Sequence, residues 1–240
     1  MMNLYPVHNE PALMFDKTLI IADLHIGIEH VLRKAGFNIP SQSRKMMERI
    51  IMLCRKHNVN RIVIVGDIKH NIPNVSYQEF DEIPRFFEAL LNLGDVDVIP
   101  GNHDGGIKKI LPENVKIHSS KGFTLSNIGF FHGHTWPDEN IMKCEYVVMG
   151  HNHPVIVFKD RLGYSFSKAC WLKGKMLKNR DRYKNANPEI IIMPSFNRLC
   201  GNPVNKKKFL GPITRMLDIK DMFVYLLNGA FLGKIKGVKL

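Results

Sequence analysis

The sequence predicts a layered α/β fold. Three observations support this prediction: short apolar runs with the length of buried strands, amphipathic helical patterns between them, and an ordinary globular composition. The 240 residues are 45% hydrophobic and 23% charged, which excludes a disordered chain, a collagen and a coiled coil. Because a chain of this length buries roughly 70 to 75% of its unfolded surface, it needs no structural metal, and we expect any metal site to serve chemistry.

Six apolar runs predict interior strands. Each has four or five residues and ends at a polar residue or glycine, which is typical of strands in a layered fold. Runs without polar alternation suit strands that are covered on both faces. The predicted strands are 18–22, 61–65, 96–99, 128–131, 146–149 and 189–193.

Two patterns with helical spacing lie between these runs. Positions 46, 50, 53 and 54 are apolar, and so are positions 83, 86, 87, 90 and 91, so we expect two helices that each pack one face on the core. Asn58 and Gly94 stand where these helices should end. Residues 16–17, 126–127 and 160–163 predict turns, and the last two should close hairpins.

We expect residues 1–240 to form a single domain. The metal-type motifs described below span residues 23–153, and a basic C-terminal elaboration follows from about residue 170 to 240. Residues 173–188 are polar and basic and are the best candidate for an exposed excursion. Residues 222–232 are shorter than the roughly 20 residues of a membrane span, so we expect a buried helix or strand there.

The formal net charge of +12 lies entirely in the last third of the chain. Residues 1–154 carry 16 Lys and Arg against 17 Asp and Glu, whereas residues 155–240 carry 18 against 5. Such a block favours a polyanionic partner, with nucleic acid first. The alternative is a basic surface that only maintains solubility.

The cysteines and the N-terminus indicate a cytoplasmic protein. Cys54, Cys144, Cys170 and Cys200 are far apart and form no CxxC pair, which predicts reduced thiols. Glu10 and Asp16 interrupt the start of the chain, so we expect no signal peptide.

Five segments carry metal-type ligands directly after an apolar run. Loops at the carboxyl ends of strands converge in such folds, and carboxylate, imidazole and amide oxygen together suit two hard or borderline divalent ions with one bridging carboxylate. Six of the eleven histidines fall in these segments and no thiolate does, which favours manganese, iron or a catalytic zinc pair over a structural zinc site. The segments are Asp23-Leu24-His25, Gly66-Asp67, Gly101-Asn102-His103-Asp104, His132-Gly133-His134 and Gly150-His151-Asn152-His153.

The ordered series D-x-H, G-D, G-N-H-D, H-G-H and G-H-x-H resembles the calcineurin-like metallophosphoesterase superfamily. The resemblance implies an α/β/β/α sandwich with mixed sheets and a metal site at the carboxyl ends of the strands. The local sequences DLHIGIEH, GNHDG, HGHTWP and MPSFNRLCG are similar to the archaeal branch related to SbcD-type DNA repair nucleases.

The resemblance also implies the site residues. It assigns two divalent ions, Mn²⁺ first with Fe, Zn and Ni as alternatives. The first ion takes Asp23, His25, Asp67 and His153, and the second takes Asp67, Asn102, His132 and His151. His103 would act as the general acid, with Asp104 orienting it. From its place beside His132, we expect His134 to contact a phosphate oxygen, whereas His70 fits either a site extension or an ordinary helix start.

We therefore expect a dinuclear metal-dependent phosphoesterase that hydrolyses phosphodiester bonds in DNA or other nucleic acid, with Lys206, Lys207 and Lys208 as candidate backbone contacts. One alternative is a small-molecule phosphomonoesterase or cyclic-nucleotide phosphodiesterase. Another is a metal-stabilised scaffold subunit of a DNA-repair complex, beside a helicase, ligase or ATPase. His103 argues against the scaffold, because a scaffold needs no general acid. The resemblance is also compatible with a dimer.

Overall fold

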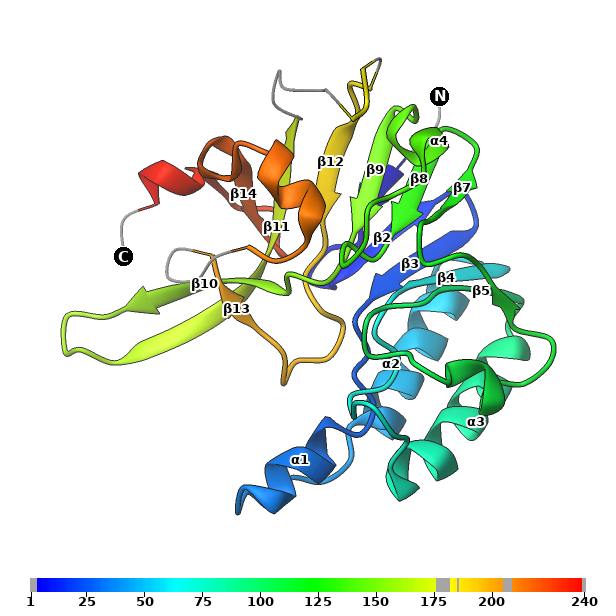
Figure 1. Cartoon of the computed structure of the whole chain (residues 1–240). Coiled ribbons are helices and arrows are strands. Elements are labelled where there is room, and N and C mark those ends of the chain that lie inside the picture. The colour runs from blue at the N-terminus through cyan, green and yellow to red at the C-terminus, as the bar shows by residue number, and fades with distance from the viewer. Residues whose placement is uncertain (1–3, 176–181, 185, 205–208, 239–240) are drawn as a thin grey trace.

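The computed structural model describes residues 4–175, 182–184, 186–204 and 209–238 and contains two mixed β-sheets (Figure 1). The first sheet has the order β1-β2-β3-β4-β5-β6. Its first three strands pair antiparallel, and β3 to β6 pair parallel. The strands are β1 (Leu4–Pro6), β2 (Ala12–Phe15), β3 (Thr18–Ala22), β4 (Arg61–Val65), β5 (Asp95–Ile99) and β6 (Lys116–Ile117).

The second sheet has the order β13-β10-β11-β12-β9-β8-β7, and β14 joins it on β11 and pairs with β15. Its centre is parallel, because β8, β9 and β12 run in one direction. The strands are β7 (Phe123–Leu125), β8 (Ile128–Phe131), β9 (Tyr146–Met149), β10 (Pro154–Lys159), β11 (Ser165–Lys175), β12 (Glu189–Ile192), β13 (Asn202–Pro203), β14 (Phe223–Leu226) and β15 (Phe231–Lys234).

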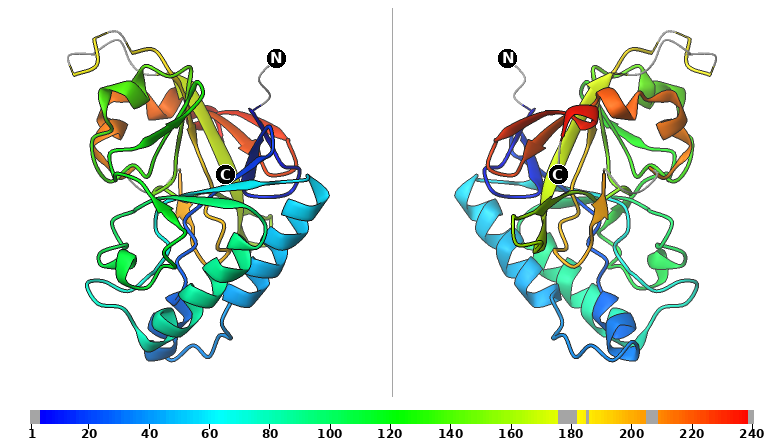
Figure 2. Two further views of the ribbon diagram at one scale, coloured as in Figure 1. Left: turned by 90° about the vertical axis from the view of Figure 1, so that its right-hand side faces the viewer. Right: turned by 90° about the vertical axis from the view of Figure 1, so that its left-hand side faces the viewer.

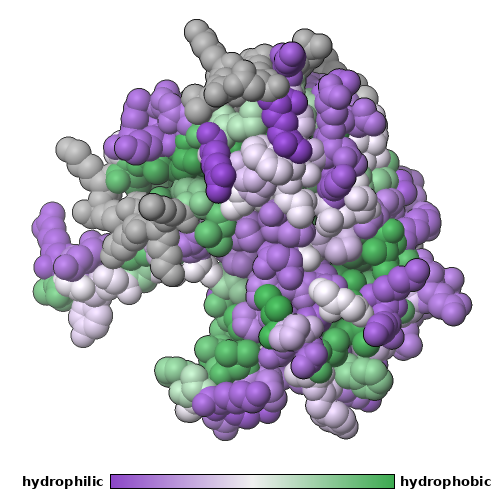
Figure 3. Space-filling model, viewed as in Figure 1, coloured by the Kyte–Doolittle hydropathy of each residue, from purple (hydrophilic) through white to green (hydrophobic). Residues whose placement is uncertain are grey.

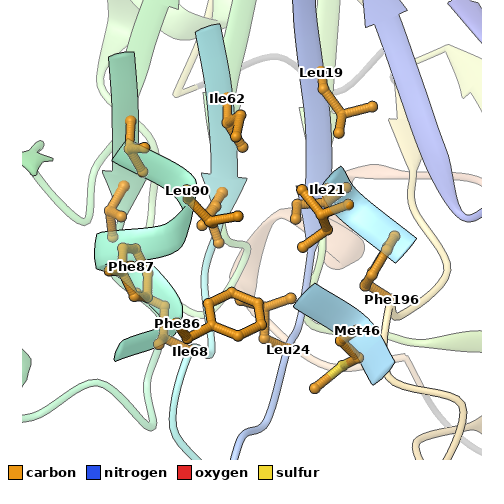
Figure 4. Packing of buried hydrophobic residues seen from close by; sticks show 14 of the residues in the cluster. Leu19, Ile21, Leu24, Met46, Ile62, Ile68, Phe86, Phe87, Leu90 and Phe196 are labelled. Atoms are coloured by element: carbon orange, nitrogen blue, oxygen red, sulfur yellow. The ribbon is translucent and has the colours of Figure 1, made fainter. Parts of the chain in front are cut away.

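Two amphipathic helices cover the outer face of the first sheet. They are α2 (Ser43–Lys56) and α3 (Tyr77–Leu91), and the short helix α1 (Ile28–Lys34) precedes them. The Ser76 side chain accepts from the Glu79 amide and caps the start of α3. Figure 4 shows Met46 of α2 and Phe86 of α3 facing the strands that carry Ile21 and Ile62.

Alternate residues of the central strands supply two different cores. In β3, Leu19 and Ile21 pack under the helices, whereas Ile20 and Ala22 pack between the sheets. Each fully buried aliphatic side chain contributes roughly 1.5 to 3 kcal/mol. A register shift of one residue would exchange the two faces, so the packing fixes the register.

Short helices cover the outer face of the second sheet. The core there includes Met142 of α4 (Glu139–Met142) and Ile213 of the 3₁₀ helix η2 (Pro212–Met216). Figure 2 shows these elements on the opposite side of the molecule from α2 and α3. The predicted α/β/β/α architecture is therefore confirmed, and its fourth layer consists of short helices. Other 3₁₀ helices are η1 (Ile107–Lys109), η3 (Ile219–Asp221) and η4 (Ile235–Gly237).

The predicted elements agree closely with the structure. Four strands are confirmed at their predicted bounds, and the predicted hairpin turns connect β7 to β8 and β10 to β11. Residues 222–232 contribute to the β14–β15 hairpin. None of the described helices is long and apolar enough to cross a membrane.

The expected exposed excursion at 173–188 needs a correction. Residues 173–175 end β11, and Tyr183 is buried with its hydroxyl donating to the Pro137 carbonyl at 2.6 Å. The segment predicted to be exposed therefore contains a buried aromatic residue, Tyr183, which its basic composition did not indicate. Residues 176–181 and 185 lie outside the described residues.

Candidate metal centre

The five predicted motifs meet at one edge of the two sheets. The parallel strands β3, β4 and β5 end at the same edge of the first sheet, and β8 and β9 end together in the second. Each motif begins directly after one of these strands or one residue later. Because the carboxyl ends of parallel strands place their loops side by side, the site forms where the two sheets meet.

The first cluster consists of Asp23, His25, Asp67 and His153, with one ligand atom of each within 4.8 Å of all the others. His25 Nε2 lies 3.5 Å from Asp67 Oδ2, and His153 Nε2 lies 3.4 Å from Asp23 Oδ2. The two imidazole Nε2 atoms are 3.3 Å apart. The structure thus brings together the four residues predicted for one ion.

The second cluster consists of Asp67, His132 and His151. His132 Nε2 lies 3.4 Å from Asp67 Oδ2 and 3.0 Å from Asp23 Oδ1. Asp67 therefore belongs to both clusters, as a bridging carboxylate must. Asn102 is exposed on the loop after β5, and its role as a ligand stays a prediction.

The backbone is strained at five of these residues. Left-handed φ angles occur at Asp23 (56°), His25 (42°), Asp67 (40°), His151 (69°) and His153 (42°). This conformation costs energy for residues with a side chain and persists only where the surroundings enforce it. The left-handed conformation turns the chain sharply after each strand, so that the ligand side chains from different loops meet in one cluster.

A loop after β12 supports the strained Asp23–His25 segment. The Ser195 hydroxyl donates to the Asp23 carbonyl at 2.7 Å, and the Asn197 Nδ2 donates to the Leu24 carbonyl at 2.8 Å. Both side chains are buried. The motif MPSFNRLCG contains this loop. Nothing in the motif indicates that its side chains contact the distant Asp23–His25 segment.

Two glycines permit close approach of the ligands. A Cβ atom at Gly66 would lie 2.0 Å from His132 Cδ2. A Cβ at Gly101 would lie 2.1 Å from Asp67 Oδ1 and 2.4 Å from the Asp67 nitrogen. Neither distance is sterically possible, so a side chain at either position would displace a candidate ligand.

The electrostatics of the cluster suit divalent cations. Burial and neighbouring His132 lower the pKa of His151 to about 3, which keeps this imidazole neutral, the form that binds metals. Burial raises the pKa of Asp67, and the adjacent Asp23 carboxylate adds to this. Two carboxylates buried together need compensating positive charge. Their oxygen and nitrogen donors therefore fit a pair of divalent ions.

His103 lies at the edge of the centre, but its partner differs from the prediction. Its Nδ1 donates to the His70 carbonyl at 2.5 Å, and its Nε2 lies 4.0 Å from Asp67 Oδ2. Asp104 does not orient the ring. Its carboxylate accepts from the backbone amides of Ile68 at 2.8 Å and Gly101 at 2.7 Å, so it fixes the loops that carry the ligands.

Two further histidines lie beside the clusters. His134 Nδ1 is 3.0 Å from His132 Nδ1, and burial together with His132 lowers the pKa of His134 to about 4. His70 Nδ1 is 3.2 Å from His25 Nδ1, and its ring stacks on His103. His70 therefore lies beside the first cluster and does not begin a helix, since α3 starts at Tyr77. Lys206, Lys207 and Lys208 lie outside the described residues.

Comparison with known proteins identifies a matching family and a structure of similar fold. The family model described as calcineurin-like phosphoesterase matches residues 17–192. The structure of the Pseudomonas putida nuclease MPE is 16% identical, with a TM-score of 0.55 over 94% of this chain and 96% of that one. Yfce, a phosphoesterase from E. coli, is 15% identical, with a TM-score of 0.44 over 92% of this chain and 99% of that one. The likeness to MPE shows a shared fold.

Proposed function

The chain belongs to the calcineurin-like phosphoesterase family, and from this premise we propose that the hydrolase cleaves phosphodiester bonds in nucleic acid at a centre of two divalent ions. The two overlapping clusters that share Asp67 support the dinuclear centre. The similarity of the local motifs to the SbcD-related branch supports a nuclease-like role. Mn²⁺ is the preferred ion in this proposal, with Fe, Zn and Ni as alternatives.

In the proposed centre, the first ion is held by Asp23, His25, Asp67 and His153. The second is held by Asp67, Asn102, His132 and His151. Such ions, when bound, supply an activated water and stabilise the negative charge that develops on the phosphate.

His103 is the proposed proton donor. Because its Nδ1 donates to the His70 carbonyl, the ring is held with Nε2 towards the centre. The side chain is 21% exposed, so a leaving oxygen can reach Nε2 from solvent. In this proposal His134, whose Nδ1 lies 3.0 Å from His132 Nδ1, donates to a phosphate oxygen.

The observation that carries the choice of nucleic acid is the hairpin formed by β10 and β11. Strand β10 begins directly after His153, and the hairpin projects from the body of the molecule (Figure 1). Residues 159–168 are all exposed and include three basic residues, Lys159, Arg161 and Lys168, and one acidic residue, Asp160. A polyanion bound along this hairpin would lead directly into the metal centre.

The hairpin also presents aromatic side chains. Tyr164 is 74% and Phe166 50% exposed, and Phe158 stacks on Phe166 with 5.4 Å between ring centroids. Lys168 Nζ lies 5.9 Å from the Phe166 ring. In Figure 3 apolar and hydrophilic side chains lie together on this projection. Aromatic rings beside cations are how proteins bind single-stranded nucleic acid without sequence preference.

The proposal is tested by incubating Mn²⁺-loaded protein with labelled single- and double-stranded DNA. We expect cleavage by the wild type and a loss of about 10²- to 10⁴-fold in His103→Ala, with unchanged metal content. Equal cleavage by the variant would indicate a contaminating nuclease. If small phosphomonoesters are hydrolysed and no nucleic acid is cut, the small-molecule alternative is correct.

Substitutions in the hairpin test the choice of substrate. Each base stacked on an aromatic ring contributes about 1 to 3 kcal/mol, so Tyr164→Ala with Phe166→Ala should weaken single-strand binding roughly 5- to 150-fold per stacked base. Hydrolysis of bis-p-nitrophenyl phosphate should be unchanged. Tyr77→Ala is the matched control, because Tyr77 is 86% exposed on α3, away from the hairpin.

A further inference from the structure

The loop after β12 brings a thiol to the first metal cluster. Cys200 Sγ and one ring nitrogen each of His25 and His153 lie within 4.8 Å of one another. Among the described residues, no other cysteine joins such a cluster. The five sequence motifs contain no thiol, so the fold adds a donor that the motifs lack.

The position of Cys200 is fixed by the same loop that supports the ligand segment. The Cys200 amide donates to the Asn197 carbonyl at 3.1 Å. The Asn197 side chain in turn donates to the Leu24 carbonyl and, at 3.4 Å, to the His25 carbonyl, and its Oδ1 accepts from the Leu199 amide. Asn197 is 1% exposed, so a buried amide connects the thiol to the segment that carries His25.

A cavity adjoins Cys200. Cys200 lines a cavity of about 320 Å³ together with His153 and Ser195. Cys200 therefore offers a sulfur donor beside two imidazoles that also belong to the first cluster, those of His25 and His153. Thiolate selects softer ions than carboxylate does, because sulfur is the more polarisable donor.

We propose that Cys200 is a further ligand of the ion held by His25 and His153 and makes this position favour thiophilic ions such as Zn²⁺, Co²⁺ and Cd²⁺ over Mn²⁺, so that the Mn²⁺ preference proposed above applies to the second position. The inference rests on the proposed function, since it assumes that the first cluster holds an ion. On binding, the S–H bond breaks, its proton passes to solvent and a sulfur–metal bond forms. No electron is transferred.

The inference is tested by titrating the metal-free protein with Co²⁺ and recording its absorption. We expect a near-ultraviolet thiolate-to-Co²⁺ charge-transfer band in the wild type and its loss in Cys200→Ser and Cys200→Ala. Cys144→Ser should keep the band. It is the matched control, because Cys144 is also partly exposed but its thiol lies near the Asn140 carbonyl.

A second measurement uses affinity. Loss of an outer partner of a metal ligand already lowers metal affinity by about 10- to 100-fold, so removal of a direct sulfur ligand in Cys200→Ser should weaken Zn²⁺ binding by at least about 10-fold and weaken Mn²⁺ binding much less. Bound Zn²⁺ should also protect Cys200 from iodoacetamide, as measured by mass spectrometry of the peptide.

The outcomes separate this inference from the proposed centre. If Co²⁺ binds the wild type without a charge-transfer band, or if the band survives in both Cys200 variants, the thiol is no ligand and the metal centre stands. If equilibrium dialysis detects no bound Co²⁺, Zn²⁺ or Mn²⁺, both the inference and the proposed centre are overturned.

Discussion

Gly101 supports the centre by having no side chain. Its backbone passes so close to Asp67 that an added Cβ would lie 2.1 Å from Oδ1. Its amide also donates to Asp104 Oδ2 at 2.7 Å. Since Asp67 belongs to both clusters, any displacement of its carboxylate disturbs both ion positions together.

We expect Gly101→Ala to lower the affinity for both ions by about 10- to 100-fold, the size of effect seen when the support of a metal ligand is altered. Isothermal titration with Mn²⁺ measures this. Gly105→Ala is the matched control, because a Cβ there meets nothing within 4 Å. Equal affinities in the two variants would show that Asp67 tolerates the displacement.

At the scale of elements, the start of helix α3 supports the loop that contacts His103. Glu79 Oε1 accepts from the amides of His70 at 2.8 Å and Asn71 at 2.7 Å, and Oε2 accepts from the Ser76 amide at 2.6 Å. Burial raises the pKa of Glu79, but these backbone hydrogen bonds outweigh burial and lower it overall. The carboxylate thus holds the loop whose carbonyl orients His103.

Glu79→Gln replaces one accepting oxygen by an NH₂ group and leaves at least one buried amide without its partner. We expect the free energy of unfolding to fall by about 1 to 3 kcal/mol, measured by urea denaturation. Glu88→Gln, an exposed position on the same helix, should change it little. A stability for Glu79→Gln equal to that of Glu88→Gln would contradict the proposed support.

Asp97 joins three parallel strands of the first sheet. Its carboxylate lies 2.7 Å from Arg61 Nε of β4 and 2.7 Å from Nε2 of His118, which follows β6. Burial raises the pKa of Asp97, but the hydrogen bonds from His118 and Arg61 outweigh burial and bring it below its ordinary value of 3.8. The ionised form is therefore the one that stabilises the fold.

Because the pKa of Asp97 is lowered on folding, its stabilising contribution is fully present above pH 3.8 and is lost as the pH falls through the lower folded-state value. We expect the urea midpoint of the wild type to fall more steeply below about pH 4 than that of Asp97→Asn. Asp95→Asn, on the same strand but exposed, should follow the wild type. Parallel curves for all three proteins would exclude this contribution.

At the scale of the whole molecule, the candidate centre connects the two sheets. Asp23 and Asp67 follow strands of the first sheet, whereas His132, His151 and His153 follow strands of the second. Ions shared by these residues bind only when the sheets are packed together. Metal binding should therefore stabilise the folded molecule as a whole.

We expect Mn²⁺ at 100 times its dissociation constant to add about 2.7 kcal/mol to stability for each ion bound, and for a chain of this size each such increment raises the melting temperature by roughly 5 to 11 °C. Calorimetry with Mn²⁺ and after chelation measures this shift. Asp67→Asn should show little of it, whereas Asp218→Asn, at an exposed position, should retain it. A full shift in Asp67→Asn would place the ions elsewhere.

Sequence patterns alone identify the central strands, helices α2 and α3, and the five motifs. Their signals are local, because burial on both faces produces short apolar runs and each ligand directly follows its own strand. The clusters around Asp67 could be expected from this order, since parallel strands end at a common edge.

The residues that support these ligands are evident from the folded chain and not from its sequence. Asn197 donates to the Leu24 carbonyl, 173 positions away in the sequence. Cys200 lies beside His25 and His153. Asp104 accepts from backbone amides and does not contact the His103 ring. The hydrophobic periodicity of the sequence does not indicate such contacts. They depend on the order of strands in two sheets and on which loops their packing brings together, because residues distant in sequence become neighbours only through that packing.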